Sequence, residues 1–484
     1  MTDTIADFAW YGFKLGFGLF SLASVWGNAA VNYGAVWARD SEEEKRELAA
    51  AQQKHWSLDR EPLPGFKHAF FKTSNGVSLH YVVNTQTGSS TPRNVAIFIH
   101  GFPDSFLLWR YILQSPELLR NHILIAVDLP GYGGSDSLPA YGPNEILETL
   151  TEYIIGMREL FLQEDKRVVV VTHDWGALIG ARLASEAKDL ADHWIITSAI
   201  IVHCSPHLTT ANALSQTKLF KQMLHTWFRS PFNFRLLRNS LHALGPVISQ
   251  FRRSFYIFCF NLPRPFSKFF ATFGNYWFLR ILHDLGKGKP KKNEKVLARL
   301  SIKEAAEAMA ISTGPALAQL EPNNDIQDRY GESVRKRVRD RGMTEKIGIY
   351  RDGLFIGKWE KSLETTAALF EMAAGGASSA HSSTSSGPLL NSAPTGALKA
   401  PTTFILGEHD PAFDRRLAFD NIKDFLVKGS QVALVKGAGH WLPIEPTGRR
   451  VLEKTIQWAL HERSSGSEKS PFAVSSDVRI IEEL

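Results

Sequence analysis

Short apolar runs separated by glycine-rich loops mark the middle and the end of the chain. The run at 167–171 (RVVVV) is short, β-branched and apolar on both faces, which is typical of a buried strand in a parallel sheet. The runs at 95–99 (VAIFI), 404–407 (FILG) and 432–436 (VALVK) show the same character. Helical segments lie between them. The pattern predicts an α/β fold, a mostly parallel sheet with helices on both faces.

An aspartate stands just beyond the strand at 167–171. Asp174 is followed by Gly176, Ala177 and Gly180, which open a helix without bulky side chains near its start. Small residues there allow a sharp strand-to-helix turn that lifts one side chain above the sheet. Hydrolases with this elbow usually carry serine. A carboxylate in its place forms an ester by attacking saturated carbon, which favours opening of epoxides or displacement of halides.

Loops after the other strands supply the partners that such a nucleophile needs. The HGFPD turn after the strand at 95–99 brings the backbone N–H of Phe102 towards that of Trp175, and the two predict an oxyanion hole. His440 lies in a glycine loop. Asp410 and Glu408 compete for the role of acid, and Asp410 is preferred because it precedes a proline at the loop start. The chain order is nucleophile, acid, histidine.

These motifs identify a family. The chain resembles the epoxide hydrolases of the α/β-hydrolase fold over roughly 66–460, apart from one insertion. The resemblance rests on HGFPDS at 100–105, DLPGYGGSD at 128–136, HDWGA at 173–177, GEHDP at 407–411 and GAGHW at 437–441. Thr172 is a departure, because the pattern usually has glycine there. The resemblance implies a helical cap over the strand ends and no cofactor or metal. It implies a substrate-binding set of Phe102, Pro103, Trp175, Tyr256, Tyr350 and Trp441.

Two tyrosines are candidates for the acid that protonates an epoxide oxygen. Tyrosine suits that role because its phenol stays protonated at neutral pH. Tyr256, in YIFCFNLP, looks like the family's first cap-tyrosine segment, with Asn261 where glutamine is more usual. Tyr350, in YRD, is similar to the segment that carries the second. The alternative is that both tyrosines only fill the core.

The motifs and the composition together divide the chain. We expect an N-terminal helix that serves as a membrane anchor with a linker, a hydrolase core in two parts, a helical cap between them, a disordered Ser/Ala/Gly-rich insertion and a C-terminal tail. The expected bounds are, in that order, 1–57, 58–203 with 356–462, 204–355, 372–399 and 463–484.

The N-terminal segment predicts contact with a membrane. No charge occurs from Leu15 to Ala38, and a helix of that length reaches about 36 Å, enough to cross a hydrocarbon core. The prediction is a membrane anchor or interfacial helix; the alternatives are a helix packed on the soluble domain and a cleaved peptide. We therefore expect membrane association, at the endoplasmic reticulum. No N-x-[ST] acceptor occurs, which favours a cytosolic catalytic domain. A cytoplasmic protein is the alternative.

Charge in the cap region points the same way. Between Asp192 and Asp284 there is no acidic residue, although basic and aromatic residues are frequent. Such a mixture suits an anionic lipid surface, so membrane lipid is an expected partner. The alternative is a phenylalanine-lined pocket with solvated arginines around it. The net charge of +6 is too diffuse to indicate nucleic acid, and two cysteines exclude a disulfide framework. The oligomeric state is not predicted.

The sequence predicts an enzyme that converts a small apolar epoxide to a vicinal diol through an ester on Asp174. A haloalkane dehalogenase is the nearer alternative, but such enzymes commonly have asparagine where this chain has Phe102. The stretch at 195–208, where some of them carry the acid, has none. The other alternative is a membrane-associated protein that keeps the fold without turnover. The set Asp174, Asp410 and His440 argues against it.

Overall fold

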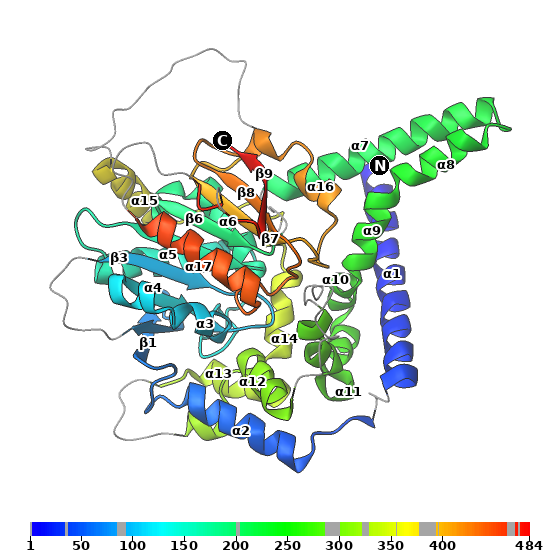
Figure 1. Ribbon diagram of the computed structural model, residues 1–484. Helices are drawn as coiled ribbons and strands as arrows, with labels where there is room; N and C mark the ends of the chain where they lie inside the picture. Colours follow the sequence, from blue (N-terminus) through cyan, green and yellow to red (C-terminus); the bar gives the residue numbers. More distant parts are fainter. Residues whose placement is uncertain are drawn as a thin grey trace.

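A nine-stranded sheet forms the centre of the protein, with its strands in the order β1-β2-β4-β3-β5-β6-β7-β8-β9 (Figure 1). The computed structural model describes residues 2–33, 37–84, 93–199, 204–285, 301–321, 329–354, 356–376, 394, 396–461, 470–472 and 475–484. The strands are Phe66–Lys72 (β1), Ser78–Asn84 (β2), Asn94–Ile99 (β3), His122–Val127 (β4), Val168–His173 (β5), His193–Thr197 (β6), Thr402–Gly407 (β7), Gln431–Val435 (β8) and Val478–Glu483 (β9).

The sheet is parallel from β4 through β8, and β1, β2 and β9 run antiparallel to their neighbours. The prediction of an α/β fold with a mostly parallel sheet is therefore confirmed. All four predicted apolar runs are buried strands of the parallel part. The carboxyl ends of these strands meet at one edge, where open α/β sheets bind their ligands.

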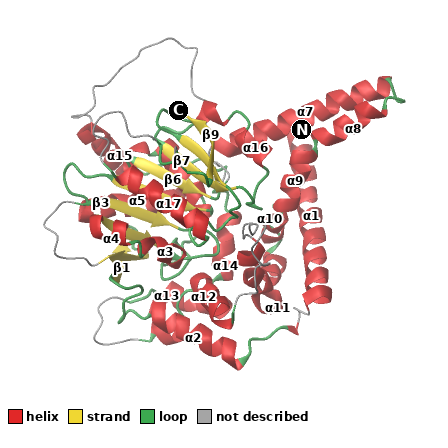
Figure 2. Cartoon of the chain, in the orientation of Figure 1, coloured by secondary structure: helices red, strands yellow, loops and turns green. Residues whose placement is uncertain are grey.

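Each face of the sheet has its own hydrophobic core, because alternate side chains of a strand point to opposite faces. Ile97 of β3 belongs to the cluster under α5 (Pro143–Phe161) and α6 (Trp175–Glu186). Phe98 belongs to the cluster under α17 (Pro446–Leu460). Helices thus cover both faces (Figure 2). The other helices that accompany the sheet are η2 (Phe106–Trp109), α3 (Arg110–Leu113), α4 (Pro116–Asn121), η3 (Lys188–Leu190), α15 (Leu363–Gly376), α16 (Arg415–Phe419) and η7 (Ile422–Phe425).

A set of helices between β6 and β7, α7 to η6, covers the carboxyl edge of the sheet and is called the cap below. The first two, α7 (Cys204–Arg229) and α8 (Phe234–Ala243), form a hairpin that projects from the body of the molecule (Figure 1). Helix α11 bends where Phe273 to Tyr276 leave helical dihedral angles. The others are α9 (Gly245–Arg253), α10 (Phe255–Phe260), α11 (Arg264–Leu285), α12 (Ile302–Thr313), η4 (Leu317–Leu320), α13 (Glu332–Arg337), η5 (Val338–Asp340), α14 (Met343–Lys346) and η6 (Ile347–Tyr350).

The N-terminal region contains two helices, α1 (Thr2–Tyr33) and α2 (Glu42–Trp56), so the prediction of a single helix is wrong. The reason is a capping box at Ser41. Its hydroxyl accepts from the N–H of Glu44 at 3.2 Å, and the Glu44 carboxylate accepts from the N–H of Ser41 at 2.7 Å. This reciprocal pair satisfies free N–H groups of a helix start, so it begins a new helix.

Helix α1 packs along the cap. Phe17 meets Phe258 of α10 edge to face, with ring centroids 4.8 Å apart. The missing side chain of Gly18 leaves room for the Phe258 carbonyl, which a Cβ would approach to 2.9 Å. Among the residues that the structure describes, no helix is both long and apolar enough to cross a membrane. The predicted membrane-spanning anchor is therefore unsupported, and α1 instead places one face on α10.

Two further segments differ from the expected bounds. Residues 372–376 belong to α15, and Leu398 and Lys399 bind the main chain of Phe425 and Ala184, so both ends of the predicted disordered insertion are structured. Residues 377–393 lie outside the described residues. The segment expected as a C-terminal tail supplies β9, which pairs with β8.

The close approach of α6 to β3 yields a test of this architecture. A Cβ on Gly176 would collide with the carbonyl oxygens of Ile99 and His100. We expect Gly176→Ala to lower the free energy of unfolding by about 1–3 kcal/mol, the usual cost of overpacking. Gly16→Ala, on α1 where a Cβ meets nothing within 4 Å, is the matched control and should stabilise by about 1 kcal/mol. Urea unfolding measures both; equal effects of the two changes would contradict the described contact.

Candidate active site

Asp174 stands on a sharp turn between β5 and α6. Its φ is 53° and its ψ is −119°, a conformation that non-glycine residues rarely adopt. The carbonyl of Asp174 accepts from the N–H groups of Ala177 and Leu178, which starts α6 at once. Thr172 replaces the usual glycine without distortion, because Gly180 of α6 faces it: a Cβ there would lie 2.8 Å from Thr172 Cγ2.

The carboxylate of Asp174 points towards the turn after β3. Oδ1 accepts from the N–H of Phe102 at 2.7 Å. A Cβ on Gly101 would lie 2.5 Å from both Asp174 Oδ1 and the backbone N of Trp175, so only glycine allows this approach. The two predicted N–H donors, Phe102 and Trp175, thus border the same carboxylate. The Phe102–Pro103 peptide bond in this turn is cis.

His440 lies between two carboxylates. Its Nδ1–H donates to Asp410 Oδ2 at 2.9 Å, and its Nε2 is 3.6 Å from Asp174 Oδ2. Burial lowers the pKa of His440, but the charges and hydrogen bonds of Asp410 and Asp174 outweigh burial and raise that pKa well above its usual value. Glu408, the competing acid, instead accepts from the N–H of Gly437 and does not contact the imidazole.

Glu445 supports the histidine loop, and the sequence analysis missed it. Its carboxylate accepts from the N–H of Gly439 at 2.8 Å and from the N–H of Trp441 at 3.1 Å, one residue to either side of His440. Burial raises the pKa of Glu445. The available signal was an acidic residue just before Pro446, the first residue of α17, but its partners become visible only once the loop is folded.

Two more histidines form hydrogen bonds with the backbone of the site loops. His173 donates from Nε2 to the carbonyl of His440 at 3.0 Å, and burial lowers its pKa to about 4. His100 donates from Nδ1 to the carbonyl of Gly101, and its Nε2 accepts from the N–H of Leu129. Burial lowers the pKa of His100 as well. Both rings are therefore neutral and orient the loops of the site.

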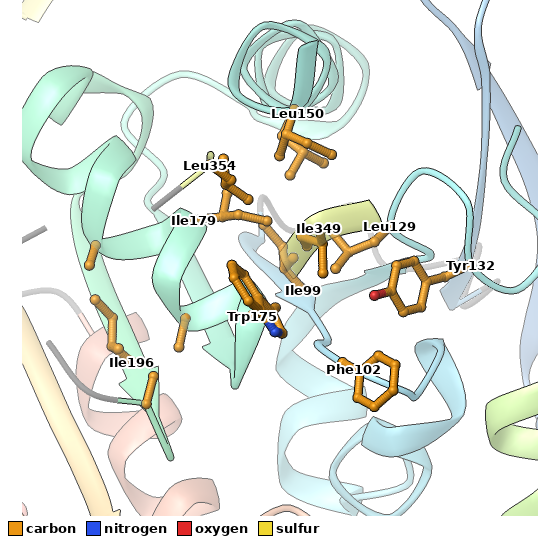
Figure 3. Close-up of a cluster of buried hydrophobic side chains, with 14 of the residues drawn as sticks. Ile99, Phe102, Leu129, Tyr132, Leu150, Trp175, Ile179, Ile196, Ile349 and Leu354 are labelled. Carbon is orange, nitrogen blue, oxygen red and sulfur yellow. The ribbon is translucent and has the colours of Figure 1, made fainter. Parts of the chain in front are cut away.

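Tyr256 and Tyr350 meet above Asp174. Their ring centroids are 5.9 Å apart, and a hydrogen bond joins the two side chains. Burial, followed in effect by the charge of Asp174, raises the pKa of Tyr256 far above its usual value; burial does the same for Tyr350. The core holds the Tyr350 segment in place, since the neighbouring Ile349 lies in the buried cluster with Leu129 (Figure 3).

A cavity of about 130 Å³ joins these groups. Asp174, His440, Tyr256, Tyr350, Phe102 and Trp441 all line it. Pro103 and Trp175, which were predicted to bind substrate, do not line the cavity. The Trp175 ring is turned against Tyr350, with ring centroids 4.7 Å apart. The sequence analysis missed six lining residues, which the cap and the loop after β7 bring in: Arg253, Phe255, Phe278, Leu282, Pro411 and Ala412.

Comparison with protein families matches the chain to the α/β-hydrolase fold over residues 94–447. The chain belongs to this family. That range holds the predicted nucleophile, acid, histidine and cap tyrosines. Each of these residues therefore lies within the part of the chain that the family defines.

Individual relatives share part of the chain. Epoxide hydrolase 3 of Xenopus tropicalis is 31% identical over 138 residues, which is 28% of this chain and 34% of the relative. A haloalkane dehalogenase of Mycolicibacterium smegmatis is 36% identical over 94 residues, 19% of this chain and 29% of the relative. The matches thus span about a third of the curated relatives. The Cif epoxide hydrolase structure from Acinetobacter nosocomialis has a TM-score of 0.46 at 15% identity, covering 88% of this chain and 98% of that one.

The position of His440 between two carboxylates predicts its titration. We expect Asp410→Asn and Asp174→Asn each to lower the pKa of His440, because each removes a negative charge that stabilises the imidazolium. Glu408→Gln is the matched control and should leave this pKa unchanged. NMR titration of isotope-labelled histidine measures all three. A fall in Glu408→Gln with none in Asp410→Asn would reverse the assignment of the acid.

Proposed function

We propose that this protein hydrolyses an apolar epoxide to a vicinal diol through a covalent ester on Asp174. One observation carries the proposal: a carboxylate on a nucleophile elbow and two partly buried, protonated phenols line the same small cavity. A carboxylate attacks carbon, and a phenol protonates the oxygen that leaves that carbon. The similarity to epoxide hydrolases supports the same reaction.

The first step opens the ring. One Asp174 oxygen bonds to an epoxide carbon, and the bond between that carbon and the ring oxygen breaks. Tyr256 and Tyr350 hold the ring oxygen, and one phenol gives it a proton. Because their pKa values are raised, the phenols stay protonated at neutral pH and remain able to donate. The product is a hydroxyalkyl ester on Asp174.

The second step hydrolyses that ester. His440, held by Asp410, takes a proton from water, and the hydroxide attacks the ester carbonyl. The N–H groups of Phe102 and Trp175 stabilise the oxyanion. The carbon–oxygen bond on the carbonyl side breaks, the proton on His440 passes to the departing alkoxide, and the diol leaves. Esterification removes the charge of Asp174, so the pKa of His440 falls and its proton returns to the phenolate that ring opening left. The neutral ring is then the base that this step needs. Ester hydrolysis leaves Asp174 as a carboxylic acid, and its proton passes back to His440, which restores the starting state.

Haloalkane dehalogenation is the second candidate, and the resemblance to a dehalogenase favours it. A departing halide takes no proton and needs only N–H dipoles. Two phenols that line the cavity are better explained by an oxygen that must be protonated. The cavity and its aromatic lining also suit a small apolar epoxide. We also propose that the protein associates with membrane lipid.

Variants of the nucleophile and the base separate the two steps. We expect His440→Gln to form the ester and not hydrolyse it, so that mass spectrometry finds one substrate adduct on the peptide with Asp174. Asp174→Asn is the matched control and should form no adduct, because an amide is a poor nucleophile. A folded His440→Gln protein that stays unmodified by every epoxide in a panel would overturn the covalent route.

The phenols distinguish epoxide from halide chemistry. Tyr256→Phe and Tyr350→Phe should each slow ester formation from an epoxide, and the double change should approach the full contribution of a general acid, about 10²–10⁴-fold. Tyr111→Phe, at a partly exposed ring on α3, is the control and should leave the rate unchanged. Stopped-flow measurements with an epoxide and a matched haloalkane provide the readout. A wild-type preference for the haloalkane would replace the epoxide assignment by dehalogenation.

A further inference from the structure

The α7–α8 hairpin presents phenylalanine to solvent at its tip. Phe228, Phe232 and Phe234 are 67%, 91% and 68% exposed. They lie on both sides of the turn between the two helices, at the end that projects from the body (Figures 1 and 2). Three large apolar side chains gathered at a projecting tip contribute little to the core. Such a cluster marks a contact surface.

The same hairpin carries only positive charge. The exposed basic residues along it are Lys218, Lys221, Arg229, Arg235 and Arg238. Aspartate and glutamate number 49 in the 484 residues of the chain, yet none occurs between Asp192 and Asp284. A hairpin with charges of one sign is complementary to a uniformly negative surface, and the exposed phenylalanines require that this surface also accept apolar groups. An anionic lipid bilayer meets both conditions.

Helix α1 extends this surface. Its inner face packs on the cap, where Phe13 and Phe17 contact Phe251 of α9, the helix that follows the hairpin. Its outer face exposes Phe8, Phe20 and Val31 at 79%, 68% and 84%. The charged residues of the helix, Asp3, Asp7 and Lys14, all lie in its first half, and none follows Lys14. A helix whose remaining length is uncharged, with one apolar face outward, can lie in the plane of a membrane interface without spanning it.

We propose that the α7–α8 hairpin and the outer face of α1 dock on an anionic lipid bilayer. The phenylalanines enter the interfacial layer, and the lysines and arginines contact lipid headgroups. The hairpin continues through α9 into α10, which carry Arg253 and Tyr256 of the cavity lining. The docked surface is thus continuous with the cap wall, and an apolar substrate dissolved in the bilayer would be concentrated beside it. Docking itself does not depend on the proposed reaction.

The test is co-sedimentation of the full chain with phosphatidylcholine vesicles, with and without phosphatidylserine. We expect binding to the mixed vesicles, weak binding to phosphatidylcholine alone, and loss of binding as salt is raised. Arg229→Gln, Arg235→Gln and Arg238→Gln should each reduce the vesicle partition constant, by about fivefold per charge removed. The triple variant Phe228→Ser, Phe232→Ser, Phe234→Ser should bind weakly at any salt concentration.

A matched control replaces exposed apolar residues elsewhere. Leu160→Ser, Leu363→Ser and Phe370→Ser, on α5 and α15, should leave vesicle binding unchanged. Turnover of a water-soluble epoxide without vesicles should be the same in every variant, so failure of docking and failure of the proposed reaction are distinguishable. No binding to the mixed vesicles, or equal binding by the hairpin variant, overturns the proposal. A second outcome also overturns the proposal. If light scattering finds a dimer that dissociates in the hairpin variant, and vesicle binding is absent, a second copy of the chain covers the surface.

Discussion

The arrangement of the site depends on the close approach of two loops at the carboxyl ends of β3 and β5. Asp174 occupies a strained backbone conformation, and Gly101 lets the neighbouring turn come close enough for Phe102 to donate to its carboxylate. Gly176 packs against the same turn from the other side. The parallel sheet fixes both loops. The strained conformation of Asp174 is therefore maintained by contacts in the surrounding structure.

The second constraint is electrostatic. Placing His440 between Asp174 and Asp410 favours its charged form, whereas burial opposes it. A buried imidazolium is tolerated because both of its ring nitrogens face a carboxylate. The same arrangement links the charge of Asp174 to the proton affinity of His440. In the proposed reaction, esterification of Asp174 lowers the pKa of His440 and leaves the ring able to act as the base of the next step.

The cap contributes residues to two surfaces, the wall of the cavity and the exterior of the protein. Its inner wall carries Tyr256, Phe278 and Leu282 of the cavity, and its outer elements carry the exposed aromatic and basic residues. Helix α1 packs against the middle of this layer, on α10. Its apolar composition is therefore shared between one face that stabilises the cap and one that stays exposed. That division explains how the segment resembles a membrane anchor in sequence.

The sequence by itself determined the α/β class, the buried strands and the positions of Asp174, Asp410 and His440. These features are local, because strand periodicity, small residues after a turn and glycine loops each specify a conformation within a few residues. The preference for Asp410 over Glu408 also came from local sequence, yet only the folded loop shows their different partners. The break between α1 and α2 was equally local, in the Ser41 capping box, but a long uncharged run obscured it.

Only the tertiary structure determines the contacts between segments that are far apart in the chain. The partners of Glu445, the lining residues Arg253 and Phe278, and the turning of Trp175 away from the cavity depend on how the cap lies over the sheet. The packing of α1 on the cap likewise determines which of its faces is covered and which is exposed. Burial and pKa follow from neighbours far apart in the chain, and no local pattern specifies those neighbours.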